Sequence, residues 1–252
     1  NVGLQHLYKY KRGSGNLNLS LRSSTFGSDY NYSQLRFTSI NKNNLGKIDI
    51  NTRAIVQVGT GSDVAPESQL YAAGANPEEM MENKYTRSKI ITDDSWVKYG
   101  NTTNHFHHGG GLNLRGFSGY YIAQKTAEDS LDIRAVFKGN TGAAFNIELE
   151  FQKIFGFKIP KLSKVLGLSS YLFSDLGIIN YNTSDERLAF SNLRVDAGIG
   201  FLLSIKKFGP LEVVDPITLR FDIPFFLNRT PNTDPAFFQF RLVVGITLSF
   251  YP

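Results

Sequence analysis

The stretch AFNIELEF at residues 144–151 decides the fold class. Its apolar and polar residues alternate strictly, with Phe145, Ile147, Leu149 and Phe151 set against Asn146, Glu148 and Glu150. Successive side chains of a β-strand point to opposite faces, whereas an α-helix repeats about every 3.6 residues. The stretch therefore predicts a strand with one apolar face and one polar, acidic face.

The same alternation recurs along much of the chain. It is clear in residues 16–22, 46–58, 193–205, 217–223 and 238–250, and weaker near 4–12, 29–40 and 168–180. Together with 144–151 this gives about nine candidate strands. Phe occurs 20 times and Tyr 12 times, which is typical of β-structure. The sequence predicts a single all-β, antiparallel domain over residues 1–252.

Composition excludes several classes of protein. There is no Cys, so a disulfide framework and a thiolate metal site are both impossible. The net charge of +5 is modest and no charge runs occur, so we expect no nucleic-acid partner. No apolar run approaches the roughly 20 residues of a membrane helix, although membrane strands need only about 9–11. The chain begins with Asn1 rather than Met, which favours a processed or truncated product.

Alternation alone does not say which face meets water. A soluble sandwich or lipocalin-like barrel buries its apolar face, whereas a transmembrane barrel turns that face to lipid. Here the polar face is heavily charged, and aromatic residues gather near strand ends, as in the girdles of membrane barrels. The charged residues are Arg22, Arg36, Asp49, Arg53, Glu148, Glu150, Arg194, Asp196, Arg220, Asp222 and Arg241.

The connections between strands also differ in kind. Short basic ones, such as those containing Lys158 or Lys206, alternate with longer polar ones, the longest being residues 61–141. Short turns on one side and long loops on the other are typical of outer-membrane barrels. We therefore expect a transmembrane β-barrel in the bacterial outer membrane, with membrane lipid and lipopolysaccharide as partners. A soluble β-barrel binding protein remains the alternative.

The 61–141 region should be mostly loop, with one short helix. In NPEEMMENK, Asn76 suits the N-cap, Pro77 suits the first helical position, and Glu78 and Glu79 suit the first turn. A connection of this length is usually functional. It also contains GGGLNLRGF at 109–117, in which a glycine hinge leads into apolar residues around one cation, Arg115.

LNLRGF resembles the loop motif of the outer-membrane assembly and secretion superfamily that includes BamA, TamA and FhaC. The resemblance implies that the loop folds back into the barrel and that its arginine meets a Phe-x-Asp on a later strand. Arg115, Gly116 and Phe117 match the motif, and Phe173 and Asp175 match the Phe-x-Asp. Glu148 and Glu150 lie where the superfamily has an acidic residue in the lumen. The implied function is insertion or translocation of proteins at the outer membrane.

Two departures from that superfamily leave alternatives open. Its barrels have more strands than the nine or so predicted here, and its periplasmic POTRA modules are absent. Either another chain or a missing N-terminal segment completes the barrel, or the chain forms a closed barrel of about eight strands. Residues 67–88, 101–117 and 209–229 also resemble the C-terminal tails of bacterial gluzincin aminopeptidase-like proteins. That resemblance implies a non-conducting membrane anchor for a peptidase.

The chain carries no recognisable catalytic motif. HExxH, GxSxG, P-loop and GxGxxG patterns are all missing, so whether the protein is an enzyme stays open and we expect no cofactor. The segment NHFHHGGG offers His105 and His107 as weak metal-ligand candidates, because alternate residues of an extended segment share a face. An ordinary polar loop explains these histidines better.

Overall fold

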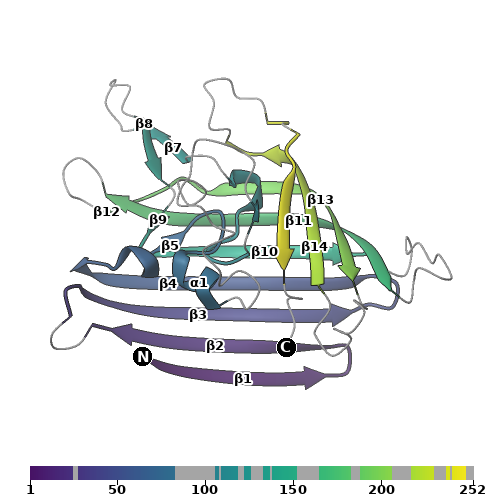
Figure 1. Cartoon of the computed structure of the whole chain (residues 1–252), viewed down its shortest axis with the longest axis horizontal. Helices are drawn as coiled ribbons and strands as arrows, with labels where there is room; N and C mark the ends of the chain where they lie inside the picture. Colours follow the sequence, from purple (N-terminus) through teal and green to yellow (C-terminus); the bar gives the residue numbers. More distant parts are fainter. Residues whose placement is uncertain are drawn as a thin grey trace.

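The computed structural model (Figure 1) describes most of the predicted strands and part of the long loop. The described residues are 1–24, 28–82, 106–107, 109–118, 122–125, 133–136, 138–151, 165–182, 188–205, 217–229, 237–238 and 240–247. Within them the protein is all-β, with a single α-helix, α1 (Pro77–Glu82).

One large antiparallel sheet forms the body of the molecule. Its strands follow in the order β1 (Val2–Tyr10), β2 (Gly13–Ser23), β3 (Asn31–Asn44), β4 (Asp49–Asp63), β10 (Gly142–Glu150), β11 (Leu166–Asn182), β13 (Arg194–Ile205), β14 (Ile217–Leu227) and β15 (Val243–Thr247). A short strand, β6 (Phe106–His107), pairs in parallel with β15 at the end of the sheet. Another short strand, β12 (Leu188–Phe190), pairs with β11 outside the main strand order. All nine predicted strands are therefore confirmed.

The sheet is curved but open. Figure 1 shows β1 to β4 as long strands side by side, whereas β14 runs steeply across their direction. Among the described residues, no pairing joins β1 to the β15–β6 end of the sheet. A closed barrel of about eight strands is thus not what these residues form, because both ends of the sheet keep a free edge.

The region 61–141 is more structured than a loop. The strand β4 continues to Asp63, and a 3-10 turn η1 (Pro66–Ser68) follows. Two small antiparallel pairs lie farther on, β5 (Leu70–Tyr71) with β9 (Lys138–Gly139) and β7 (Ile122–Lys125) with β8 (Ile133–Val136). The expectation of a loop with one helix was wrong here, because strands of two to four residues are too short for their alternation to be recognised.

The predicted helix is confirmed, including its cap. The Asn76 side-chain oxygen accepts a hydrogen bond from the Glu79 N–H at 2.8 Å, and the Glu79 carboxylate accepts one from the Asn76 N–H at 3.1 Å. This reciprocal pair is a capping box, which satisfies backbone donors that have no partner inside the helix. No helix in the described residues is long and apolar enough to cross a membrane.

The two faces of the sheet have opposite character, and from β4 onward the polar one is buried. We call inward the face on which residues 109–118 pack. On β10 the inward residues Asn146, Glu148 and Glu150 are only 4%, 9% and 3% exposed, whereas outward Phe145 is 38% exposed. A soluble domain normally shows the reverse distribution. The alternation predicted one polar and one apolar face, and the structure shows that the charged face is the inward one.

The C-terminal strand is shorter than its sequence pattern indicated. Residues 238–250 continue one apolar alternation, but within the described part of that range the strand β15 covers only Val243–Thr247. Phe238 instead makes an isolated bridge to Phe226, and the Arg241 N–H donates to the Pro224 carbonyl at 3.2 Å. Alternation alone does not reveal where ladder pairing stops.

Candidate functional site

The segment 109–118 turns inward through residues with positive φ, which are Gly110, Gly111 and Asn113. Gly111 has φ of 50°, and a Cβ there would collide with the carbonyl oxygens of Tyr71 and Gly74, so only glycine fits. Asn113 has φ of 57°, which Asn tolerates better than most residues. Beyond the turn, the N–H groups of Leu112 and Leu114 donate to the carbonyls of Tyr71 and Ala72 at 2.9 and 3.0 Å.

The apolar side chains of this segment fill the interior of the curved sheet. Leu112, Leu114 and Phe117 are at most 1% exposed. They pack in one cluster with Ile55, Leu70, Ala72, Ala73, Ala144, Ile179 and Leu227. Each such side chain stabilises the packed arrangement by roughly 1.5–3 kcal/mol relative to exposure in water. This burial explains why so apolar a segment follows a glycine hinge.

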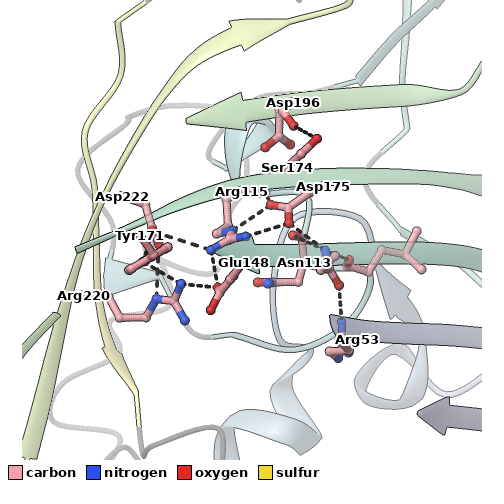
Figure 2. Close-up of polar contacts among 12 residues, drawn as sticks. Arg53, Asn113, Arg115, Glu148, Tyr171, Ser174, Asp175, Asp196, Arg220 and Asp222 are labelled. Carbon is pink, nitrogen blue, oxygen red and sulfur yellow. Dashed lines mark hydrogen bonds and ion pairs between the residues drawn. The ribbon is translucent and has the colours of Figure 1, made fainter. Parts of the chain in front are cut away.

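Arg115 enters the interior with these residues and meets a carboxylate on β11. It lies in a 3-10 turn, η2 (Arg115–Phe117), and is 1% exposed. Its Nε and Nη2 donate to the two carboxylate oxygens of Asp175, each at 2.7 Å, and its backbone N–H donates to the same carboxylate at 3.2 Å. The Phe173 ring lies under the guanidinium plane, and its centroid is 3.9 Å from the Cζ of Arg115. Such a two-pronged pair fixes orientation as well as position (Figure 2).

A second arginine extends the network across β10, β11 and β14. Glu148 accepts from Arg115 Nη1 at 2.7 Å and from Arg220 Nη2 at 2.6 Å, with the same oxygen. Arg220 also donates to the Tyr171 hydroxyl at 2.6 Å, and that hydroxyl donates to Asp222. Asp222 lies 3.6 Å from Arg115 and 3.4 Å from Arg220. Two buried cations thus face three carboxylates from three strands.

The backbone of the segment is held separately, from β4 and β10. Arg53 donates to the Gly111 carbonyl at 2.7 Å and to the Asn146 side-chain oxygen at 3.0 Å. The Asn146 amide donates to the carbonyls of Leu112 and Asn113 at 3.3 and 3.2 Å, and to Asp175 at 3.0 Å. Buried carbonyls that a strand ladder does not satisfy therefore find side-chain donors.

Small residues create the space that this network needs. A Cβ on Gly116 would come within 2.5 Å of the Asp196 Cβ, so the turn can approach β13 only with glycine there. On β13 itself, Gly198 and Gly200 face Phe173 and Tyr171 in the strand register. A Cβ on Gly198 would lie 2.6 Å from the Phe173 ring, and one on Gly200 would overlap the Tyr171 ring. The glycines allow both rings to lie flat against the neighbouring strand.

The helix α1 ties the beginning of the segment to the sheet. Glu79 accepts from the Gly111 N–H at 2.8 Å and pairs with Arg36 on β3. Glu78 pairs with Arg22 on β2 through both carboxylate oxygens and accepts from the Ser68 hydroxyl at 3.2 Å. These contacts with Arg22 hold the pKa of Glu78 below its usual value. We call these two ion pairs, Arg22–Glu78 and Arg36–Glu79, the helix strap.

The structure brings together most of the residues that the sequence singled out. Arg115, Gly116, Phe117, Phe173, Asp175 and Glu148 form one buried site. Glu150 is also buried on the inward face, two residues farther along β10 than Glu148. The sequence analysis missed the contribution of Arg53, Asn146, Tyr171, Arg220 and Asp222. The alternation placed Arg53, Arg220 and Asp222 on the charged face, but it does not show which residues of distant strands meet there.

The two histidine candidates for a metal site fall mostly outside the described residues. His105 lies outside the described residues, and only the backbone of His107, in β6, is described. No group of three possible metal ligands occurs in the described part of the chain.

Comparisons with protein-family models and with curated protein sequences gave no match. The buried network around Arg115 indicates a conformational role, because it joins the segment 109–118 to β4, β10, β11 and β14.

Proposed function

We propose that this chain is part of an outer-membrane β-barrel of the BamA-like assembly and secretion superfamily, and that it acts in protein insertion or translocation. The observation that carries the proposal is the two-pronged Arg115–Asp175 pair, with Phe173 under the guanidinium and Glu148 beside it. These are the partners that the resemblance of LNLRGF to the superfamily motif implies. In this proposal the loop 109–118 is locked against the inner wall and shapes the lumen.

The inverted faces of the sheet support a membrane location. Large apolar side chains are exposed on the outward face of successive strands, including Leu19, Leu21, Leu35, Phe37, Val56, Val58, Phe145, Leu168 and Leu172. An exposed apolar surface that continues over several strands is rare on a soluble monomer. A lipid environment accounts for it, and a lumen accounts for the paired charges on the other face.

The free edge of β1 supports a barrel with further strands. Eight of the nine residues of β1 are exposed, on both faces of the strand. Its apolar outward residues Val2 and Leu4 are 67% and 68% exposed and continue the apolar surface of β2. An edge of this kind is a template for pairing with another strand. We propose that a strand from another part of the protein or from another chain pairs there and completes the barrel.

The experiment that tests the function is removal of the gene from the bacterium that encodes it. We expect lower amounts of specific outer-membrane or secreted proteins, measured by quantitative proteomics of the membrane and culture fractions. Complementation with wild type should restore these amounts. Complementation with Arg115→Ala should restore less than an Arg229→Ala control, because Arg229 is exposed and follows the end of β14. Unchanged membrane and secreted proteins after deletion would contradict a role in insertion or translocation.

A non-conducting anchor for a peptidase is the second candidate function. The observation that favours it is the packed interior, in which Leu112, Leu114 and Phe117 lie in one buried cluster with residues of β4, β10, β11 and β14. An anchor needs no open lumen. Loss of a membrane-bound peptidase activity on deletion, with the outer-membrane proteins unchanged, would support this role instead of translocation.

A further inference from the structure

The outward face of β1, β2 and β3 changes character along the strands. At one end it is apolar, with Val2 and Leu4 on β1, Leu19 and Leu21 on β2, and Leu35 and Phe37 on β3. Toward the other end the same face carries Tyr8 and Tyr10 on β1, Gly13 and Gly15 on β2, and Asn41 and Asn43 on β3. The change falls between Phe37 and Asn41, within four residues of β3.

The polar end is a connected group of side chains rather than a scatter of loop residues. The Tyr10 hydroxyl lies 2.6 Å from the Asn41 side-chain oxygen and is also hydrogen-bonded to Asn43, and the Asn41 amide donates to the Tyr8 hydroxyl at 3.1 Å. The two rings are stacked with centroids 6.1 Å apart and lie over Gly13 and Gly15, which leave room for them. We call Tyr8, Tyr10, Asn41 and Asn43 the tyrosine–asparagine patch.

Exposed cations border the patch on its far side. Lys11 and Arg12 form the turn between β1 and β2, and Lys47 lies in the neighbouring turn between β3 and β4. The two turns are joined by a hydrogen bond of 2.6 Å from the Asn44 N–H to the Arg12 carbonyl. Along the strands, the residues thus change from apolar to aromatic to basic. The same order of residue types is favoured from the hydrocarbon core of a bilayer, through its headgroup layer, to its charged surface.

We propose that the tyrosine–asparagine patch lies in the phospholipid headgroup layer, so that one surface of the bilayer crosses β3 between Phe37 and Asn41. The tyrosine rings present an apolar body to the acyl chains and a hydroxyl to the headgroups. Lys11, Arg12 and Lys47 then face the lipid phosphates. This inference rests on the proposed membrane function and adds to it a named boundary and a lipid contact.

The surface of the bilayer should cross the sheet obliquely, and the register of the strands is consistent with this. The row that contains Tyr10 and Asn43 continues through Ile50 on β4 and Leu149 on β10 to Leu172 on β11. Leu172 is 43% exposed, and Leu168, farther toward the same end, is 41% exposed. The apolar surface thus reaches farther along β11 than along β3. Strands inclined by about 35–45° to the membrane normal produce such an offset.

Site-directed spin labelling can test the boundary, because the chain has no cysteine of its own. Single cysteines at Leu4→Cys, Lys11→Cys and Gly3→Cys would carry the label on the protein reconstituted in vesicles of phosphatidylethanolamine and phosphatidylglycerol. Gly3 is the matched control, since it neighbours Leu4 but faces inward, and an added Cβ there meets no atom within 4 Å. Collision rates with oxygen and with a water-soluble nickel complex report the depth of each label.

We expect the Leu4→Cys label to collide with oxygen severalfold more, relative to nickel, than the labels at Lys11→Cys and Gly3→Cys. If Leu4→Cys and Lys11→Cys are equally rich in oxygen, the bilayer extends past the patch and the boundary is wrong, while the membrane location stands. If Leu4→Cys is as poor in oxygen as Gly3→Cys, the outward face does not meet lipid and the proposed membrane function fails as well.

Discussion

Two sets of arginine–carboxylate contacts hold the same inward segment, and they differ mainly in burial. Arg115 and Asp175, at one end, have side chains that are 1% and 0% exposed. In the helix strap the pair Arg36–Glu79 has side chains 21% and 19% exposed, and the pair Arg22–Glu78 24% and 33%. Glu79 binds the segment directly, through the Gly111 N–H, and Glu78 does not.

The comparison teaches that similar ion pairs do different jobs at the two ends. Water can replace a partner lost from the helix strap, so each of its pairs contributes little to stability. Water does not reach Arg115, and a charge left there without its partner is costly. The buried pair should therefore decide whether the segment 109–118 stays inside the sheet. The helix strap should affect only the position of the first residues of that segment.

The largest effect is expected for Arg115→Ala. The change leaves Asp175 and Glu148 without their shared cation, and breaking a buried pair typically costs about 3–5 kcal/mol. Arg115→Lys should cost nearly as much, because a point charge cannot make the two-pronged contact. Chemical unfolding in detergent measures both, with Arg22→Lys in the partly exposed helix strap as the control. Wild-type stability of Arg115→Lys would show that the geometry of the guanidinium is unimportant.

A smaller but still large effect is expected for Glu148→Gln. One Glu148 oxygen accepts from both Arg115 and Arg220, and a neutral amide satisfies two cations poorly. We expect a loss of roughly 1–3 kcal/mol in the free energy of unfolding. Glu150→Gln is the matched control, since Glu150 lies on the same buried face of β10, opposite Tyr171 rather than Phe173 in the register. Equal losses for the two variants would mean that burial alone, and not the bridge, determines the effect.

For the helix strap we expect a local effect. Glu79→Gln weakens the pair with Arg36 and the contact with the Gly111 N–H. The loss in global stability should be below about 1 kcal/mol, as for other partly exposed pairs. Amide exchange over residues 109–113 should nevertheless accelerate, whereas Glu78→Gln should leave it unchanged. Mass spectrometry of exchanged peptides separates these outcomes, and acceleration in both variants would contradict a specific tie through Glu79.

The smallest effect is expected from acid. Because Arg22 lowers the pKa of Glu78 in the folded protein, the pair adds stability that is fully present above the unfolded pKa of about 4.3. That stability is lost as the pH falls through the lower, folded pKa. The difference in unfolding midpoint between wild type and Glu78→Gln should therefore be constant from neutral pH down to about 5 and shrink below about 4. A difference that grows on acidification would reverse the assigned sign.

Much of the fold could be predicted from the sequence, since the period of two is a local property. It located the nine main strands and placed Glu148 on the charged face, whereas Asp175 was singled out only by its match to the Phe-x-Asp of the resembling superfamily. The cluster around Arg220 could not be predicted, because it depends on the register between strands that lie far apart in the chain. The link from Glu79 to Gly111 depends on where a helix meets a loop, which no local pattern reveals.

The open edge of the sheet could not be predicted from the sequence either. Alternation identifies a strand but not its neighbours, so β1 reads like any other strand until its pairing is known. The residues of the inward segment show the opposite case. Arg115 and Asp175 are 60 residues apart and no periodicity connects them, yet their contact was expected because the loop motif resembles one whose partner is a Phe-x-Asp.

The central claim is that the Arg115–Asp175 pair fixes the segment 109–118 inside the sheet. A double-mutant cycle of Arg115→Ala and Asp175→Ala, with amide exchange of residues 109–118 as the readout, tests it most directly. If the two side chains act as one unit, the double variant should exchange no faster than the faster single variant, because either change already removes the contact. Additive effects of the two substitutions on exchange would mean that the residues act independently, and would contradict the account.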